Sequence, residues 1–291
     1  MFLPIGDDVD NRSLSIIGIL LIFVCVFVFV AELKTASKPY TGKTEIQQFV
    51  KTWGLVPKDL TKGRYVGLVS HIFLHGDFWH IAGNLIVLWA FANSLENHLG
   101  AAKLLMFFLL WGIAGGLAHA AMQWGQSLPL IGASGAIAGM IGAYWMAFGG
   151  LTKIKTIFWF FRPHVVMIPT PVFVFIWVMM QFMGASESKS GPGGIAWFCH
   201  LGGFLAGACT IFPFRNRTAK AMSLDGQGRV RFEDRPTEAD DADEPLPAVE
   251  ECPFCHTALE PIDDPSASFV RCPSPKCQRL VFLDPQLSIT L

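Results

Sequence analysis

The chain has 291 residues, of which 52% are hydrophobic and only 15% are charged, and its mean hydropathy is +0.44. Soluble domains carry about 25% charged residues, so this composition excludes a soluble protein and indicates a membrane protein. Basic residues outnumber acidic ones 13 to 9 in residues 1–214, whereas acidic ones outnumber basic ones 14 to 9 in 215–291. Neither part has the clustered positive charge that phosphate backbones require, so we expect no nucleic-acid partner.

Six apolar stretches approach the length of about 20 residues that a helix needs to cross a bilayer. The first follows Asp7, Asp8 and Asp10 instead of a basic cluster, so we expect it to be retained and not cleaved as a signal peptide. The predicted fold is therefore an all-α polytopic membrane protein with six transmembrane helices. The expected helices lie at 14–33, 79–97, 104–123, 132–150, 165–184 and 195–214.

The second stretch begins with a polar cluster that includes His80 and Asn84, which are four residues apart and so share a helix face. Both side chains can donate a hydrogen bond to an oxyanion. A metal site is the alternative interpretation, since His71, His75 and His80 with Asp77 could bind zinc or iron. The metal interpretation leaves the polar residues of the later helices unexplained.

The fourth stretch carries Ser134 among small residues. Small residues also let helices approach closely in lipid, so Gly132, Gly135 and Gly139 could serve packing alone. In the sixth stretch, His200 is an ionisable side chain within an apolar helix, which is costly and indicates a functional site. Gly203 and Gly207 give that helix a small-residue face.

Close packing of these two small-residue faces would bring Ser134 and His200 within hydrogen-bond distance. A neutral histidine can take the proton of a serine hydroxyl and activate it as a nucleophile. The fourth, fifth and sixth stretches contain no carboxylate that could orient the histidine, so the sequence predicts a Ser-His dyad and not a full triad. A purely structural interhelical hydrogen bond is the alternative role for His200.

The C-terminal part of the chain is acidic and contains four cysteines, grouped in two pairs along the sequence. Residues 237–251 are too poor in large apolar side chains to form a core, so we expect a flexible tether. The spacing of Cys252, Cys255, Cys272 and Cys277 is typical of a zinc ribbon that holds a structural Zn²⁺, although unpaired cytosolic thiols are an alternative. Such a module could dock a cytosolic protein.

Four parts of the chain follow from these features. We expect an N-terminal segment at 1–13, a six-helix membrane domain at 14–214, an acidic linker at 215–251 and a zinc-ribbon-like module at 252–291. Zinc-binding thiolates must stay reduced, which favours the cytosolic face for the tail. Lys and Arg are in excess in cytoplasmic loops, and the short loops of this chain show that excess on the side of both termini, once residues 34–64 are set apart as an interfacial element. We therefore expect an inner (cell) membrane protein with both termini in the cytoplasm.

The sequence around Ser134 (Gly-Ala-Ser-Gly), His200 with its two glycines, and His80-x-x-x-Asn84 resemble the rhomboid protease family over residues 14–214. The resemblance implies an intramembrane serine endopeptidase that cleaves transmembrane segments of proteins in the lipid bilayer without a catalytic cofactor. It implies Ser134 as the nucleophile and His200 as the general base. It also implies an oxyanion hole made by His80, Asn84 and the backbone N–H of Ser134.

The same resemblance implies a structural role for Glu96. Because residues 184–195 are rich in glycine, this loop and the fifth helix are the candidates for a cap and a lateral gate. Two positions depart from the family pattern. Position 138, often an aromatic residue that packs on the catalytic histidine, is Ala138, so something else must hold the imidazole. The Trp-Arg pair of many members is replaced by Trp53-Gly54.

Two functions from other classes stay open. A catalytically inactive rhomboid-like chaperone or receptor would share the fold without the reaction. A zinc-binding membrane adaptor would act through its tail.

Overall fold

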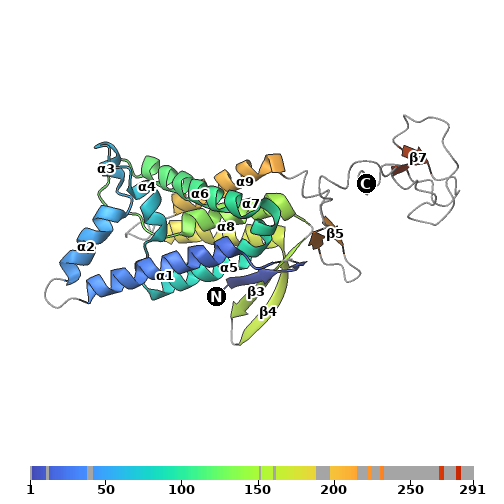
Figure 1. Cartoon of the computed structure of the whole chain (residues 1–291), viewed down its shortest axis with the longest axis horizontal. Coiled ribbons are helices and arrows are strands. Elements are labelled where there is room, and N and C mark those ends of the chain that lie inside the picture. The colour runs from blue at the N-terminus through green and yellow to red at the C-terminus, as the bar shows by residue number, and fades with distance from the viewer. Residues whose placement is uncertain are drawn as a thin grey trace. The chain divides into compact units, whose positions relative to one another are not determined.

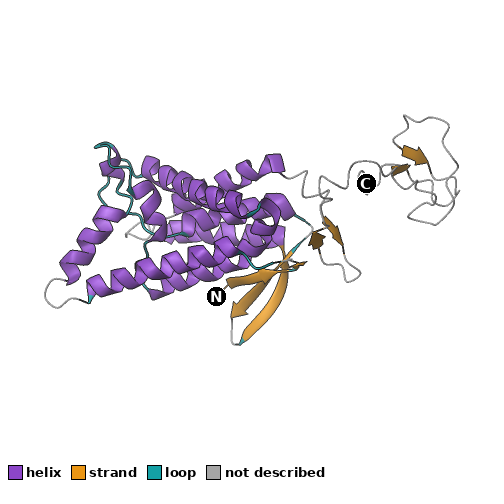
Figure 2. Ribbon diagram, in the orientation of Figure 1, coloured by secondary structure: helices purple, strands orange, loops and turns teal. Residues whose placement is uncertain are grey.

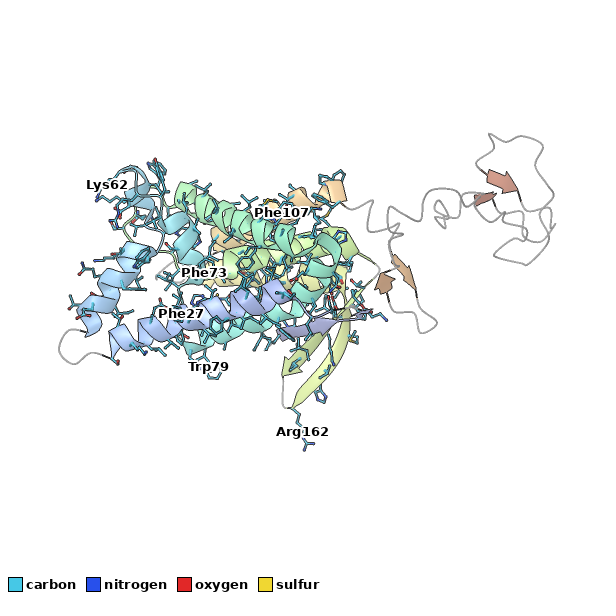
Figure 3. The ribbon with its side chains drawn as sticks, viewed as in Figure 1. Phe27, Lys62, Phe73, Trp79, Phe107 and Arg162 are labelled. Carbon is cyan, nitrogen blue, oxygen red and sulfur yellow. The ribbon has the colours of Figure 1, made fainter. Side chains whose placement is uncertain are left out.

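The computed structural model describes residues 2–10, 13–37, 42–150, 152–159, 162–187 and 197–214, together with four short strands nearer the C-terminus. The chain forms two compact units, one made of residues 1–218 and 222–232, the other of 219–221 and 233–291. The described residues of the second unit are β7 (Phe269–Arg271) and β8 (Leu280–Phe282), which pair antiparallel. The first unit is mostly helical, as Figure 2 shows.

Each of the six predicted stretches overlaps one helix of the first unit. Among the described residues, four helical segments are long and apolar enough to span a membrane: α1 (Ile16–Ala36), α5 (Phe78–Leu99), α6 (Ala101–Met122) and α9 (Trp197–Ile211) with its 3₁₀ extension to Phe214. The helices α7 (Ser134–Phe148) and α8 (Thr170–Glu187) have shorter apolar stretches. A helical membrane bundle is thus supported, while the crossing by α7 and α8 stays a prediction.

The expected all-α class is wrong, because the first unit also contains sheets. β1 (Phe2–Asp7), β3 (Lys153–Trp159) and β4 (Pro163–Pro169) form an antiparallel sheet in the order β1-β3-β4, drawn beside the bundle in Figure 1. In β3 the exposed Lys153 and Lys155 alternate with the buried Ile154 and Thr156, the period-two pattern of a half-buried strand. A second sheet pairs β2 (Val9–Asp10) with β6 (Val230–Phe232), which pairs with β5 (Met222–Leu224).

The fifth helix begins at Thr170 and not at residue 165 as predicted. Val165 and Val166 pair with Ile157 and Thr156 in β4, where β-branched side chains are favoured. A helix through this stretch would also meet Pro169, which disfavours the α conformation of the residue before it. The strand therefore runs directly into the helix.

Glu96, near the end of α5, holds the beginning of α1. Its carboxylate accepts hydrogen bonds from the backbone N–H groups of Ile16 at 3.2 Å and Ile17 at 2.9 Å, and from the hydroxyl of Ser15. The first N–H groups of a helix have no partner inside it, so this carboxylate satisfies them and complements the positive end of the helix dipole. The role of Glu96 is structural.

Asp7 joins the sheet to the same end of the bundle. The hydroxyl of Ser94 in α5 donates to Asp7 Oδ2 at 2.5 Å. Burial raises the pKa of the Asp7 carboxyl to about 6, although the hydrogen bond from Ser94 acts in the opposite direction.

The raised pKa of Asp7 predicts a pH-dependent stability. Between about pH 4 and 6 the folded chain keeps a proton that the unfolded chain releases, so the free energy of unfolding falls as the pH rises, by roughly 1–3 kcal/mol. Above about pH 6 the protonated Asp7 carboxyl no longer contributes to the free energy of unfolding. We expect Asp7→Asn to lack this slope when unfolding temperatures are measured in detergent from pH 4 to 8. An identical pH dependence in both proteins would contradict the assignment.

The helices α7 and α9 pack with their backbones in contact, through glycines on both. A Cβ atom on Gly203 would overlap the carbonyl oxygen of Gly135, and one on Gly207 would overlap that of Gly139. A Cβ on Gly139 would also overlap the side chain of Trp111 in α6. Small residues are thus required on both helices at this interface, as in close packing of helices in lipid.

We expect Gly207→Val to lower the unfolding temperature strongly, because the added side chain must push α9 away from α7. Overpacking of a tight interface costs typically about 1–3 kcal/mol and often more where backbone must move. Gly83→Ala in α5 is the matched control, since a Cβ there meets nothing within 4 Å. Equal unfolding temperatures for the two variants would show that the interface is not as close as described.

Candidate active site

Ser134 is the first residue of α7, and the segment before it is held in place by backbone hydrogen bonds. Leu55 and Leu130 exchange two bonds, at 3.0 and 2.8 Å, and the N–H of Gly132 donates to the carbonyl of His71 at 2.8 Å. The backbone N–H of Ser134 therefore lies at a helix N-terminus, where donors point away from the helix. Such donors are suited to bind a negative oxygen.

His200 in α9 meets the serine directly. Its Nε2 lies 2.8 Å from Ser134 Oγ, which is a normal hydrogen-bond distance. The two side chains come together because the glycines of α7 and α9 allow these helices to touch. An imidazole nitrogen in this position can accept the hydroxyl proton as the oxygen attacks an electrophile.

The other nitrogen of the imidazole has a partner that the sequence did not predict. His200 Nδ1 lies 2.6 Å from Oε1 of Gln181 in α8. The ring of Trp177, one turn earlier in α8, lies 6.3 Å from the imidazole, measured between centroids. Ala138 is fully buried in the core and contributes no ring to the site. The sequence predicted no orienting carboxylate and gave no role to Gln181, although this lone glutamine within the apolar residues 172–183 is a visible signal.

His80 and Asn84 lie in the first turns of α5, whose N-terminus is capped by Asp77. Asp77 Oδ1 accepts from the backbone N–H groups of Trp79 and His80 at 2.8 and 3.0 Å. A Cβ on Gly132 would lie 2.7 Å from His80 Nε2 and 3.8 Å from Ser134 Oγ, and Gly132 has φ of +121°. The glycine is thus needed both for its backbone conformation and to leave His80 room beside the serine.

The protonation of His80 and the surroundings of Asn84 both suit hydrogen-bond donation toward the site. The backbone N–H of Gly76 points to His80 Nδ1 at 3.5 Å, which favours the proton on Nε2, the nitrogen next to Gly132. Asn84 is only 8% exposed, and its Nδ2 finds no hydrogen-bond partner among the described residues. A buried donor without a partner is costly and calls for a functional explanation.

The residues of the alternative metal site have other partners. His71 Nδ1 bonds the carbonyl of Gly67 at 2.7 Å, His75 Nδ1 bonds the carbonyl of Phe73 at 3.2 Å, and the Asp77 side chain caps α5. No group of three or more His, Cys, Asp or Glu side chains in the described part of the chain is arranged to hold a metal ion. The metal interpretation of His71, His75, His80 and Asp77 therefore has no support there.

Three predicted features lie wholly or mainly outside the described residues. The expected tether at 237–251 lies outside them, as do the four cysteines of the expected zinc site at positions 252, 255, 272 and 277. Residues 188–195, which make up most of the expected cap, also lie outside them.

Comparison with known proteins shows similarity of this chain to rhomboid proteins. Residues 62–217 match the rhomboid domain family. The chain is 30% identical to rhomboid protease GluP of Bacillus subtilis over 187 aligned residues, and the alignment covers 63% of this chain and 34% of the relative. It is 31% identical over 104 residues to the mitochondrial Rhomboid protein 1 of Saccharomyces cerevisiae; the alignment covers 33% of this chain and 29% of the relative. It is 33% identical over 104 residues to rhomboid protease GlpG of Yersinia enterocolitica; here the alignment covers 33% of this chain and 34% of the relative. The chain spans about a third of the length of these relatives.

Proposed function

Because the chain belongs to the rhomboid family, we propose that it is an intramembrane serine endopeptidase that cleaves transmembrane segments of other membrane proteins. The observation that carries the proposal is the 2.8 Å contact between Ser134 Oγ and His200 Nε2, made between two helices of the bundle. Relatives of this chain are named as proteases, which supports the reaction class.

In the proposed mechanism, Ser134 Oγ attacks the carbonyl carbon of the scissile peptide bond while His200 Nε2 takes the hydroxyl proton. The negative oxygen of the tetrahedral intermediate accepts hydrogen bonds from His80, Asn84 and the backbone N–H of Ser134. His200 then gives its proton to the leaving amine, which produces an acyl-enzyme. A water molecule, deprotonated by His200, releases the second fragment. No cofactor enters these steps.

A peptide bond in a transmembrane helix is shielded by its own hydrogen bonds and by the absence of water. The substrate helix must therefore unwind locally, which glycine, proline and other poor helix formers make easier. We propose that substrates enter beside α8, with residues 184–195 as the cap of the site. The chain would lie in the inner (cell) membrane with both termini in the cytoplasm.

The proposed test is cleavage by the purified chain in proteoliposomes that contain a single-span substrate with a glycine- and proline-containing helix. We expect two fragments whose junction lies within the span, and much slower cleavage when the helix-breaking residues are replaced by leucine. Absence of cleavage over a panel of such substrates would favour the alternative, an inactive rhomboid-like chaperone or receptor.

We further propose that Cys252, Cys255, Cys272 and Cys277 hold a structural Zn²⁺ in an accessory module that could bind a cytosolic protein. The support is the spacing of the four thiols, which suits tetrahedral zinc. We expect metal analysis of the full chain to find zinc that the double substitution Cys272→Ser, Cys277→Ser removes, with proteolysis retained. A cellular effect of the protein that is lost with the tail but persists in Ser134→Ala would favour the adaptor alternative, in which the tail is central.

A further inference from the structure

We propose that Gln181 is the positioning residue of the site, because it fixes the tautomer and the orientation of His200. This inference rests on the proposed function. The amide of Gln181, in α8, takes the orienting role that a carboxylate has in a catalytic triad. Its basis is the 2.6 Å contact between Gln181 Oε1 and His200 Nδ1.

The contact determines which imidazole nitrogen carries the proton. A carbonyl oxygen can only accept, so Nδ1 must be the protonated nitrogen of the neutral ring. Nε2 is then left with its lone pair directed at Ser134 Oγ, 2.8 Å away. This is the tautomer that a general base needs, because the opposite one would present an N–H to the hydroxyl.

A second contact agrees with this orientation of the Gln181 amide. Its Nε2 donates to the backbone carbonyl of Trp177, four residues earlier in α8, at 3.5 Å, the long end of the hydrogen-bond range. In the flipped arrangement the amide oxygen would face this carbonyl oxygen, and two acceptors would oppose each other. With the amide oxygen toward His200, both ends of the amide have partners.

The surroundings of Gln181 favour a strong and directed bond. The hollow beside it, between α8 and α9, is lined by apolar side chains that include Trp177, Val178, Leu201 and Phe204. Hydrogen bonds are stronger in such low-polarity surroundings than in water. Trp177 stacks on Phe204 of α9, with ring centroids 5.9 Å apart, which holds this turn of α8 against the helix that carries His200.

Packing alone would not replace this bond. Trp177 restrains the position of the imidazole from a centroid distance of 6.3 Å, but a ring contact does not select a tautomer. Three helices thus contribute one group each: Ser134 comes from α7, His200 from α9 and Gln181 from α8. The base is correctly set only while α8 is seated beside α9.

The test compares two changes at position 181 with one control substitution elsewhere in the full chain. Gln181→Leu removes the acceptor, Gln181→Glu keeps an oxygen at the same reach, and Met106→Leu alters a 48% exposed position of α6 as the control. We expect Gln181→Leu to lower kcat by roughly 10- to 100-fold with KM unchanged, because it removes one hydrogen bond to an imidazole that becomes charged during the reaction. Gln181→Glu should stay within a few-fold of the parent, and Met106→Leu should equal it.

A second readout does not depend on activity. ¹⁵N spectra of histidine-labelled protein distinguish an imidazole protonated on Nδ1 from one protonated on Nε2, and His200→Asn assigns the signal. We expect the Nδ1–H form in the parent and in Gln181→Glu, and a shift toward Nε2–H in Gln181→Leu. Should Gln181→Leu fail to fold, Gln181→Asn, which is one methylene too short to reach, serves in its place.

The inference is overturned if removal of the acceptor leaves both kcat and the tautomer of His200 unchanged. It is also overturned if the Leu and Glu variants lose activity equally while the tautomer stays the same, which would indicate a packing role. If the parent itself neither cleaves substrates nor reacts with a phosphonate probe, the proposed function fails. The tautomer measurement then still decides the role of Gln181 in orienting His200.

Discussion

Ser134→Ala should abolish cleavage of a transmembrane substrate, with kcat reduced by ~10⁴-fold or more, because removal of a serine nucleophile leaves no group that can form the acyl-enzyme. The hydroxyl contributes to the site through its contact with His200 at 2.8 Å, and it makes no other hydrogen bond among the described residues. We therefore expect the unfolding temperature in detergent to be almost unchanged. Initial rates of fragment release in proteoliposomes measure the effect.

The matched control for this substitution is Ser127→Ala, which removes an exposed hydroxyl from the segment that leads to α7. It should cleave at the parental rate. Cleavage at equal rates by Ser134→Ala and Ser127→Ala would exclude Ser134 as the nucleophile. The Ser134→Ala protein is also the reference for membrane proteomics, in which the natural substrates should accumulate uncleaved.

Asn84→Leu should lower kcat by about 10²–10³-fold and leave KM nearly unchanged, because an oxyanion donor binds a charge that exists only after nucleophilic attack. The same substitution should preserve or raise the unfolding temperature. In the parent, Asn84 Nδ2 is buried without a partner among the described residues, and leucine has similar volume without that cost. Loss of activity with gain of stability separates a functional role from a structural one.

Asn97→Ala is the control, since it removes the same type of side chain from the other end of the same helix. Asn97 bonds the backbone carbonyls of Ser13 and Asn93, so we expect a small loss of stability and parental kinetics. Substrate titrations of both variants provide kcat and KM. A raised KM with unchanged kcat for Asn84→Leu would mean that Asn84 binds the substrate instead of the oxyanion.

The motifs in this sequence predicted the family and much of the site. The resemblance carried by Ser134, His200 and the His80-x-x-x-Asn84 sequence is confirmed by the match of residues 62–217 to the rhomboid domain. The structure brings Ser134 to His200 and His80 to Gly132. These residues could be found because helix spacing and costly polar groups in apolar stretches are visible along the chain. Their catalytic roles remain predictions.

Gln181 is visible in the sequence as a polar residue in an apolar stretch, but its partner could not be predicted, and neither could the partner of Asp7. Gln181 contacts a histidine 19 positions away, and Asp7 contacts Ser94, 87 positions away. Such contacts depend on how helices and strands are placed in space, which no local pattern encodes. The lack of a carboxylate in these stretches also did not imply the lack of a third member, because a neutral amide oxygen can fix an imidazole tautomer.

The sheet was missed for a different physical reason. The alternation from Lys153 to Ile157 is short, and Val165 with Val166 continues into an apolar run that also satisfies a membrane-helix pattern. Periodicity cannot separate a short strand from the start of an apolar helix. Pro169 marked the boundary, and antiparallel pairing with β3 determined which structure formed.

The most direct test of Ser134 as a nucleophile activated by His200 is covalent labelling with a fluorophosphonate, followed by mass spectrometry of the intact chain and its peptides. We predict a single adduct on the peptide that contains Ser134, absent in Ser134→Ala and formed far more slowly in His200→Ala. An adduct on another residue, or equal labelling of the parent and Ser134→Ala, would contradict the assignment.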